Sequence, residues 1–278
     1  MRILPRFSCL FVAGSLLVAT HACTGDGQRS GSNASSSAAR TELFVYAAAS
    51  TRDVMQKIES AYERTHNVDL ILSFGSSGDL AKQIIASPNA DVFLSADDTE
   101  MNRVDSAKLV LADSRRDVLS NQLAVVESWD SVSAFTLPFT PVQLGDSGVR
   151  HLSLGNVQSV PAGRYARTWL ERIGVWSAVS SRVIAAVDVR AAVAAVEAGS
   201  AEAGIVYRTD VLRSTRLRTV YAVPIEEGPR ISYPVAAIAG RPSEAAALEF
   251  IAYLSSPVAR QIFEVMGFIV PATPPPAF

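Results

Sequence analysis

From residue 43 onward, short apolar runs alternate with longer segments in which apolar residues recur every three or four positions. The short runs predict strands, and the longer segments predict amphipathic helices. In residues 51–65, for example, Val54, Ile58 and Tyr62 fall on one helix face. Strands are expected at 43–48, 69–74, 91–96, 122–127, 151–155, 182–187, 203–207, 218–223 and 233–239. Helices are expected at 51–65, 78–87, 162–174, 189–199, 242–256 and 257–267.

This alternation of strands and helices is typical of an α/β protein with a mostly parallel sheet and helices on both faces. Two stretches depart from it. Residues 128–150 are long and turn-rich, and residues 218–234 have the pattern of a strand that crosses between two bodies. The pattern alone allows either one large domain or two lobes.

The N-terminal residues have the pattern of a targeting segment. Residues 1–22 place two arginines before an apolar stretch, "FSCLFVAGSLLVAT", which is shorter than the about 20 residues of a transmembrane helix. The sequence "VATHAC" then resembles a bacterial lipoprotein box, although two of its positions carry unusual residues. Residues 23–40 are rich in Gly and Ser and predict a tether. We therefore expect Cys23 to be lipidated; the alternative is a secreted protein with one spare thiol.

Composition narrows the classes of function. A net charge of -2 gives no reason to expect a nucleic-acid partner. Three His and two Cys, without metal-ligand spacing, argue against a metal centre. After the signal segment only His66 and His151 remain, and the Gly-x-Ser-x-Gly motif is absent, which argues against a serine hydrolase.

Small or hydroxyl residues occupy four predicted strand-to-helix turns. Each turn alone is explained by an ordinary helix cap. Together they could line a cleft with hydroxyls and free N–H groups, which favours a small anion because helix N-termini attract negative charge. The turns contain Ser50 and Thr51; Ser76 and Ser77; Pro161, Ala162 and Gly163; and Asp188, Val189 and Arg190.

Seven segments then indicate a family: "VYAAAST" (45–51), "SFGSSGDLAKQI" (73–84), "ADVFLSAD" (90–97), "VPAGRYA" (160–166), "DVRAAVAAVE" (188–197), "AGIVY" (203–207) and "YPVAAI" (233–238). With these, the chain resembles the molybdate-binding proteins of bacterial ABC importers. The resemblance implies the type II periplasmic-binding-protein fold, an α/β fold of two lobes, each a mixed sheet flanked by helices, joined by two hinge crossings. Lobe one would comprise residues 41–121 and 224–278, and lobe two residues 122–223.

The resemblance also implies the binding residues. They are the hydroxyls of Ser50, Ser77 and Tyr207 and the backbone N–H groups of Ala162 and Val189. The ligand would be molybdate or tungstate, held as an oxyanion with no cofactor and no direct cation ligands. Ser76 is expected to shape the turn. Arg164 and Arg190 stand beside the site, and we expect them to be solvent-facing or structural.

The implied function is that of an extracytoplasmic, periplasmic substrate-binding protein that delivers the oxyanion to an ABC permease and its ATPase. We expect a monomer, not an enzyme, with a lipid anchor as its membrane contact. Alternatives are a binding protein for another oxyanion such as sulfate, one for ferric iron, a ligand-sensing domain, or a hydrolase. Iron sites usually need paired tyrosines, and Tyr207 stands alone in "GIVYRTD".

Overall fold

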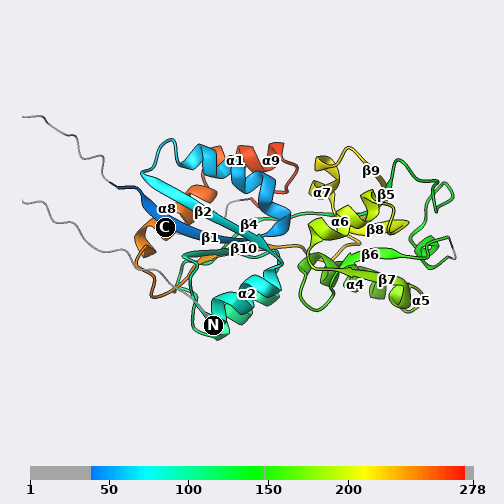
Figure 1. The fold of residues 1–278 in the computed structure, drawn as a ribbon, viewed down its shortest axis with the longest axis horizontal. Helices are drawn as coiled ribbons and strands as arrows, with labels where there is room; N and C mark the ends of the chain where they lie inside the picture. The colour runs from blue at the N-terminus through cyan, green and yellow to red at the C-terminus, as the bar shows by residue number, and fades with distance from the viewer. Residues whose placement is uncertain (1–38, 147, 273–278) are drawn as a thin grey trace, which may run out of the picture. The chain divides into compact units, whose positions relative to one another are not determined.

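Two five-stranded sheets with helices on their faces form the fold in the computed structural model, which describes residues 39–146 and 148–272. Figure 1 shows the two sheets as separate bodies, which we call lobe one and lobe two. The predicted signal segment, Cys23 and most of the predicted tether lie outside the described residues.

The sheet of lobe one has the strand order β2-β1-β3-β10-β4. Its strands are β1 (Thr41–Ala48), β2 (Val68–Gly75), β3 (Val92–Leu94), β4 (Arg116–Leu119) and β10 (Tyr233–Ala237). β1 pairs in parallel with β2 and β3, whereas β10 runs antiparallel to β3 and β4. The helices are η1 (Ala49–Thr51), α1 (Arg52–Tyr62), α2 (Ser77–Ala86), α3 (Asp98–Ser106), α8 (Glu244–Leu254) and α9 (Pro257–Val265).

The sheet of lobe two has the order β7-β6-β8-β5-β9. Its strands are β5 (Leu123–Ser128), β6 (Leu152–Gly155), β7 (Val183–Ala186), β8 (Ala203–Tyr207) and β9 (Leu217–Ala222). β6 pairs in parallel with β7 and β8, and β5 runs antiparallel to β8 and β9. The helices are η2 (Pro141–Gly145), α4 (Pro161–Arg172), α5 (Trp176–Val179), η3 (Ser180–Arg182), α6 (Val189–Glu197) and α7 (Arg208–Arg213).

In lobe one, apolar side chains from the same strand pack on both faces of the sheet and form a core on each face. In β3, Val92 and Leu94 enter the main core, and Phe93 enters a smaller core beneath α2 and α3. Successive residues of a strand point to opposite faces, so a three-residue apolar strand serves both cores. On the main-core face, the predicted stripe of α1 is buried, with Val54, Ile58 and Tyr62 at most 1% exposed.

Every expected strand and helix is present, and the expected mostly parallel arrangement holds for all strands but one in each sheet. Both sheets are mixed, as the family resemblance implies. The antiparallel strands β5 and β10 are those that enter one sheet directly from the other lobe. Parallel pairing needs a crossover, usually a helix, between consecutive strands. A strand that arrives from another lobe lacks that crossover, so strand-helix alternation does not fix its direction.

The parallel strands of each sheet have their carboxyl ends at the same edge of that sheet. β1, β2 and β3 end at one edge of their sheet, and β6, β7 and β8 end at one edge of theirs, because parallel strands share a direction. Ligands of open α/β sheets bind at such carboxyl edges. Within the described part of the chain, no helix is both long and apolar enough to cross a membrane.

Candidate binding site

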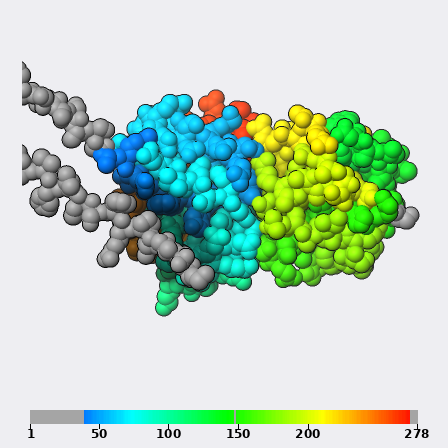
Figure 2. Space-filling view, in the orientation of Figure 1, coloured from blue at the N-terminus to red at the C-terminus, as the bar shows by residue number. Residues whose placement is uncertain are grey.

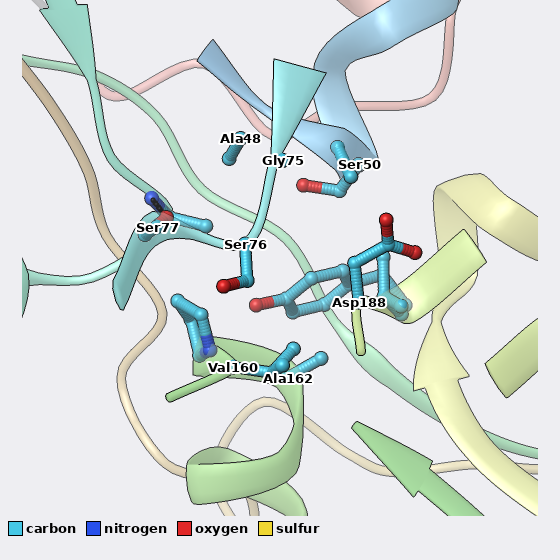
Figure 3. A pocket seen from close by; sticks show the side chains of 13 residues that line it. Ala48, Ser50, Gly75, Ser76, Ser77, Val160, Ala162 and Asp188 are labelled. Atoms are coloured by element: carbon cyan, nitrogen blue, oxygen red, sulfur yellow. Dashed lines mark hydrogen bonds between the residues drawn. The ribbon is translucent and has the colours of Figure 1, made fainter. Parts of the chain in front are cut away.

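A small pocket lies between the two lobes, at the carboxyl ends of their strands. It is small, with an empty volume of about 200 Å³, and has room for a ligand of a few atoms. Figure 3 shows Ser50, Ser76 and Ser77 across the pocket from Val160 and Ala162. The lining consists of Ala48, Ala49, Ser50, Gly75, Ser76, Ser77, Ala96, Val160, Pro161, Ala162, Asp188, Val189 and Tyr207.

All five residues that the family resemblance implied are in this lining. Ser50 lies in η1, Ser77 opens α2, Ala162 is the second residue of α4, Val189 opens α6, and Tyr207 ends β8. None of the five is more than 4% exposed. The fold therefore brings them together in a buried place; that they hold a ligand stays a prediction.

The two adjacent serines have different hydrogen bonds. Ser77 Oγ accepts a hydrogen bond from the Ala96 N–H at 2.9 Å, which leaves its own proton available to the pocket. Ser76 caps α2: its Oγ accepts from the Asp79 N–H at 3.1 Å and donates to Asp79 Oδ2 at 2.8 Å. Because a hydroxyl has a single proton, Ser76 has none left for a ligand in this arrangement.

Helix N-termini supply backbone donors from lobe two. No side chain caps α4, so the Ala162 N–H in its first turn has no partner within the helix. The start of α4 lies unusually close to β6: a Cβ at Gly163 would stand 1.9 Å from the Gly155 carbonyl oxygen. In α6 the Asp188 carboxylate accepts from the Ala191 N–H at 2.8 Å, beside Val189. Both helix ends present partial positive charge to the pocket.

Tyr207 adds a hydroxyl without a partner. Its side chain is 1% exposed, and its OH makes no hydrogen bond to the described residues. Burial raises the pKa of Tyr207 well above its usual range, so the phenol keeps its proton. A buried polar group without a partner costs about 1–3 kcal/mol, which an accepting ligand oxygen would recover.

The formal charges near the pocket are paired with one another. Neither Lys nor Arg lines the pocket, and the Asp188 carboxylate is used in capping α6. Arg164 Nη2 of α4 lies 2.6 Å from Asp97 Oδ2 and 3.0 Å from Glu100 Oε1, in lobe one. The positive charge of this arginine is thus compensated outside the pocket, which leaves neutral donors to face the ligand.

Arg190 of α6 makes a second connection between the lobes. Its Nη2 lies 2.5 Å from Asp53 Oδ2 in lobe one, and its Nε lies 3.4 Å from Asp210 Oδ1 in lobe two. Burial raises the pKa of Asp210 to about 7. Arg164 and Arg190 were expected to be solvent-facing or structural, and the second alternative describes them: both bridge the lobes and are at most 28% exposed.

The lobes also contact each other through the backbone. The Gly78 N–H of α2 donates to the Ser159 carbonyl oxygen at 3.0 Å, and a Cβ at Gly78 would lie 2.4 Å from that oxygen. On the face seen in Figure 2, lobe one (blue to cyan) lies directly against lobe two (green to yellow). The structure is therefore that of a closed pocket.

The sequence did not reveal which residues bond the pocket serine Ser50 and the interlobe arginine Arg164. The Tyr233 hydroxyl lies 3.2 Å from Ser50 Oγ, although 183 positions separate the two residues. Asp97 was visible in "ADD", but its pairing with Arg164 depends on the approach of two lobes. No local pattern signals either contact. Among the described residues, no group of three or more His, Cys, Asp or Glu side chains could hold a metal ion.

Comparison with known proteins agrees with this geometry. The family model described as bacterial extracellular solute-binding protein matches residues 43–269. The molybdate-binding protein ModA of Escherichia coli (strain K12) is 35% identical over 230 residues, which cover 82% of this chain and 89% of that protein. The putative ABC transporter substrate-binding lipoprotein YvgL of Bacillus subtilis (strain 168) is 32% identical over 247 residues, 87% of this chain and 92% of that protein.

Solved structures give the same result for the fold. The substrate-binding domain of a putative molybdenum ABC transporter from Clostridium difficile has a TM-score of 0.64 and 32% identity, and the match covers 84% of this chain and all of that one. The periplasmic molybdate-binding protein of Azotobacter vinelandii has a TM-score of 0.73 at 21% identity, over 83% of this chain and all of that one. The latter likeness concerns the fold alone.

The interlobe ion pairs lead to a prediction for Arg164→Ala. Without the guanidinium, Asp97 loses its partner and the closed state loses free energy on the order of 2 kcal/mol. Small-angle scattering of the unliganded variant should give a larger radius of gyration than the parent. Arg167→Ala is the control, because Arg167 lies on the same helix and makes its described contacts within lobe two, with Glu171 and with the ring of Trp176. Equal radii for parent and Arg164→Ala would contradict this role.

Proposed function

The chain belongs to the bacterial extracellular solute-binding protein family, and we propose that it captures molybdate or tungstate outside the cytoplasmic membrane for delivery to an ABC permease. The observation that carries the proposal is the buried Tyr207 hydroxyl, which has no partner among the described residues and lines a pocket with Ser50 and Ser77. An acceptor is needed at this point, and an oxyanion provides several.

Five groups hold the oxyanion in this proposal. The hydroxyls of Ser50, Ser77 and Tyr207 donate to its oxygens, as do the backbone N–H groups of Ala162 and Val189. Donors come from both lobes, so the ligand has its full set only when the lobes are together. A ligand shifts such an equilibrium by its differential affinity for the two states. Binding thereby stabilises the closed form that a permease would recognise.

Selectivity comes from size and from complete desolvation. Donors spaced for a larger tetrahedral dianion leave some of their number unpaired around sulfate, at about 1–3 kcal/mol for each missed partner. In this proposal the role is binding without catalysis, in keeping with the solute-binding family to which the chain belongs. Sulfate binding is the alternative outcome of the test below.

The lobes move about two crossings in this proposal. The chain leaves lobe one between β4 and β5 and returns between β9 and β10. We place lobe one at residues 41–121 and 224–278 and lobe two at 122–223, so that the crossings act as the hinge. The protein works as a monomer with one ligand in the cleft.

Calorimetric titration tests the function directly. Full-length protein in detergent is titrated with molybdate, tungstate, sulfate and phosphate. Tight binding of the first two, with weak or no binding of the others, supports the proposal. Preference for sulfate would favour the alternative, and the absence of binding to all four anions would falsify the proposed function.

The serines give a sharper prediction. Ser50→Ala and Ser77→Ala should each weaken molybdate binding by about 1–3 kcal/mol, because each leaves a charged ligand short of a donor. Ser76→Ala is the matched control: it removes a neighbouring hydroxyl whose proton is bonded to Asp79. It should lower thermal stability slightly through the lost helix cap and change affinity much less. A larger loss of affinity for Ser76→Ala than for Ser77→Ala would reverse their assigned roles.

Tyr207→Phe separates binding from folding. The variant should lose about 1–3 kcal/mol of molybdate binding and show less ligand-induced compaction in scattering. Its unliganded melting temperature should not fall, because the deleted hydroxyl has no partner among the described residues. Tyr62→Phe, which deletes another buried and unpartnered hydroxyl away from the pocket lining, is the control and should bind like the parent. Parent-like affinity in Tyr207→Phe would show that the phenol does not touch the ligand.

We further propose that Cys23 is lipidated and holds the protein at the outer face of a membrane. Support comes from "VATHAC" and the Gly/Ser-rich residues that follow it, and the similar Bacillus subtilis protein is named a lipoprotein. Mass spectrometry of membrane fractions should identify an acylated N-terminal Cys23. A free N-terminus further along the chain, in protein recovered only from the soluble fraction, would rule the anchor out.

A further inference from the structure

A chain of buried hydrogen bonds runs from the first crossing between the lobes to Ser50. Asn121 lies in that crossing, between the end of β4 at Leu119 and the start of β5 at Leu123. Its Nδ2 lies 3.3 Å from the Tyr233 hydroxyl, which lies 3.2 Å from Ser50 Oγ. Asn121 is 5% exposed, Tyr233 0% and Ser50 4%, so water does not compete for these bonds.

The direction of each bond in this chain follows from which atoms can donate. The Gln122 N–H can only donate, and it lies 2.9 Å from one side-chain atom of Asn121, which must therefore be Oδ1. The other atom is Nδ2, and its two hydrogens go to Thr209 Oγ1 at 2.9 Å and to the Tyr233 oxygen. Tyr233 thus accepts from Asn121, and its own proton is left for Ser50.

The opposite direction of the hydrogen bond between Ser50 and Tyr233, with Ser50 as the donor, is unfavourable. If Ser50 donated to Tyr233, the phenol proton of Tyr233 could turn only toward the neighbouring Tyr207 oxygen, with which it makes no well-formed hydrogen bond in this structure. Burial raises the pKa of Tyr233 above its usual range, so this proton stays in place. With Tyr233 as the donor, Ser50 Oγ accepts this hydrogen bond, and the Ser50 proton is free to point into the pocket. No other hydrogen bond to the described residues takes that proton.

The second serine of the pocket has the same arrangement. Ser77 Oγ accepts from the Ala96 N–H, which likewise leaves the Ser77 proton free. The Ser50 and Ser77 hydroxyls therefore both face the pocket as donors, because each already accepts a hydrogen bond from another group. At Ser77 a backbone amide performs this task, and at Ser50 only a side chain, Tyr233, is in place to do so.

We propose that Tyr233, held by Asn121, is a positioning residue that fixes the Ser50 hydroxyl as a proton donor to the bound oxyanion. The inference rests on the proposed function, since it assigns how Ser50 reaches its ligand. Tyr233 is absent from the pocket lining, and its hydrogen bond to a lining residue is the one with Ser50. At 3.2 Å the bond is long for two hydroxyls, so its effect on affinity is moderate.

A double-mutant cycle tests this role in full-length protein, with molybdate as the probe in calorimetric titration. Tyr233→Phe should weaken binding roughly three- to tenfold. The same substitution in a Ser50→Ala background should change binding less than twofold, because the residue through which it acts is gone. Tyr62→Phe, a buried tyrosine of the same lobe with no hydroxyl partner among the described residues, is the control for loss of a phenol oxygen.

Asn121→Asp provides a second variant in case Tyr233→Phe unfolds. An ionised carboxylate accepts from Tyr233 instead of donating to it, which leaves Ser50 to donate to Tyr233 and removes its proton from the pocket. Molybdate binding should weaken in this variant too, and again only where Ser50 is present.

The outcomes separate this inference from the function on which it rests. Equal fold-losses with and without Ser50 would mean that Tyr233 supports the lobe and not the hydroxyl, and would overturn the inference alone. Parent-like binding by Tyr233→Phe would do the same. A parent protein that binds neither molybdate nor tungstate would overturn the proposed function together with the inference.

Discussion

Hydrogen-bond donors that the protein leaves unpaired in a buried place are the constraint on which the rest of this structure depends. The Tyr207 hydroxyl, the Ser77 proton and the first-turn N–H of α4 all meet in one small pocket. Such groups are costly when dry and unpaired. The edge of one sheet presents its helix N-termini to only one side of an ion. To surround an ion with donors, two such edges must face each other. The two-lobed fold meets that requirement.

The charged side chains near the pocket are paired or used in helix capping, so that neutral donors line the pocket. Arg164 and Arg190 lie beside the pocket, but each is paired with at least one carboxylate of lobe one, and Asp188 is used in capping its own helix. In the proposed function, the pocket therefore meets an anion with dipoles and hydroxyls, which are directional, and not with mobile cationic side chains. Directional donors distinguish ligands by the positions of their oxygens, whereas a free ammonium or guanidinium group would attract any anion.

The sequence was sufficient to predict those strands, helices and pocket residues that depend on local pattern or on family motifs. The expected strands and helices exist, and the motifs located five residues that the fold gathers into one lining. α3 was missed because only three of its nine residues are buried, so its apolar periodicity is weak. β4 was missed because its sequence, RDVL, begins with two charged, exposed residues, so only Val118 and Leu119 contribute an apolar signal. The partners of Ser50 and Arg164 escaped because they lie in distant segments that only the closed fold brings together.

The Gly78 to Ser159 bond gives the closed form a property that its ion pairs lack. Ion pairs between partly exposed side chains weaken as ionic strength rises, because dissolved ions screen them. A bond between a backbone N–H and a backbone carbonyl carries no net charge and has no group that titrates. Contact between the lobes is thus divided between a part that responds to salt and a part that does not. A rise in ionic strength should therefore weaken the contact between the lobes without abolishing it.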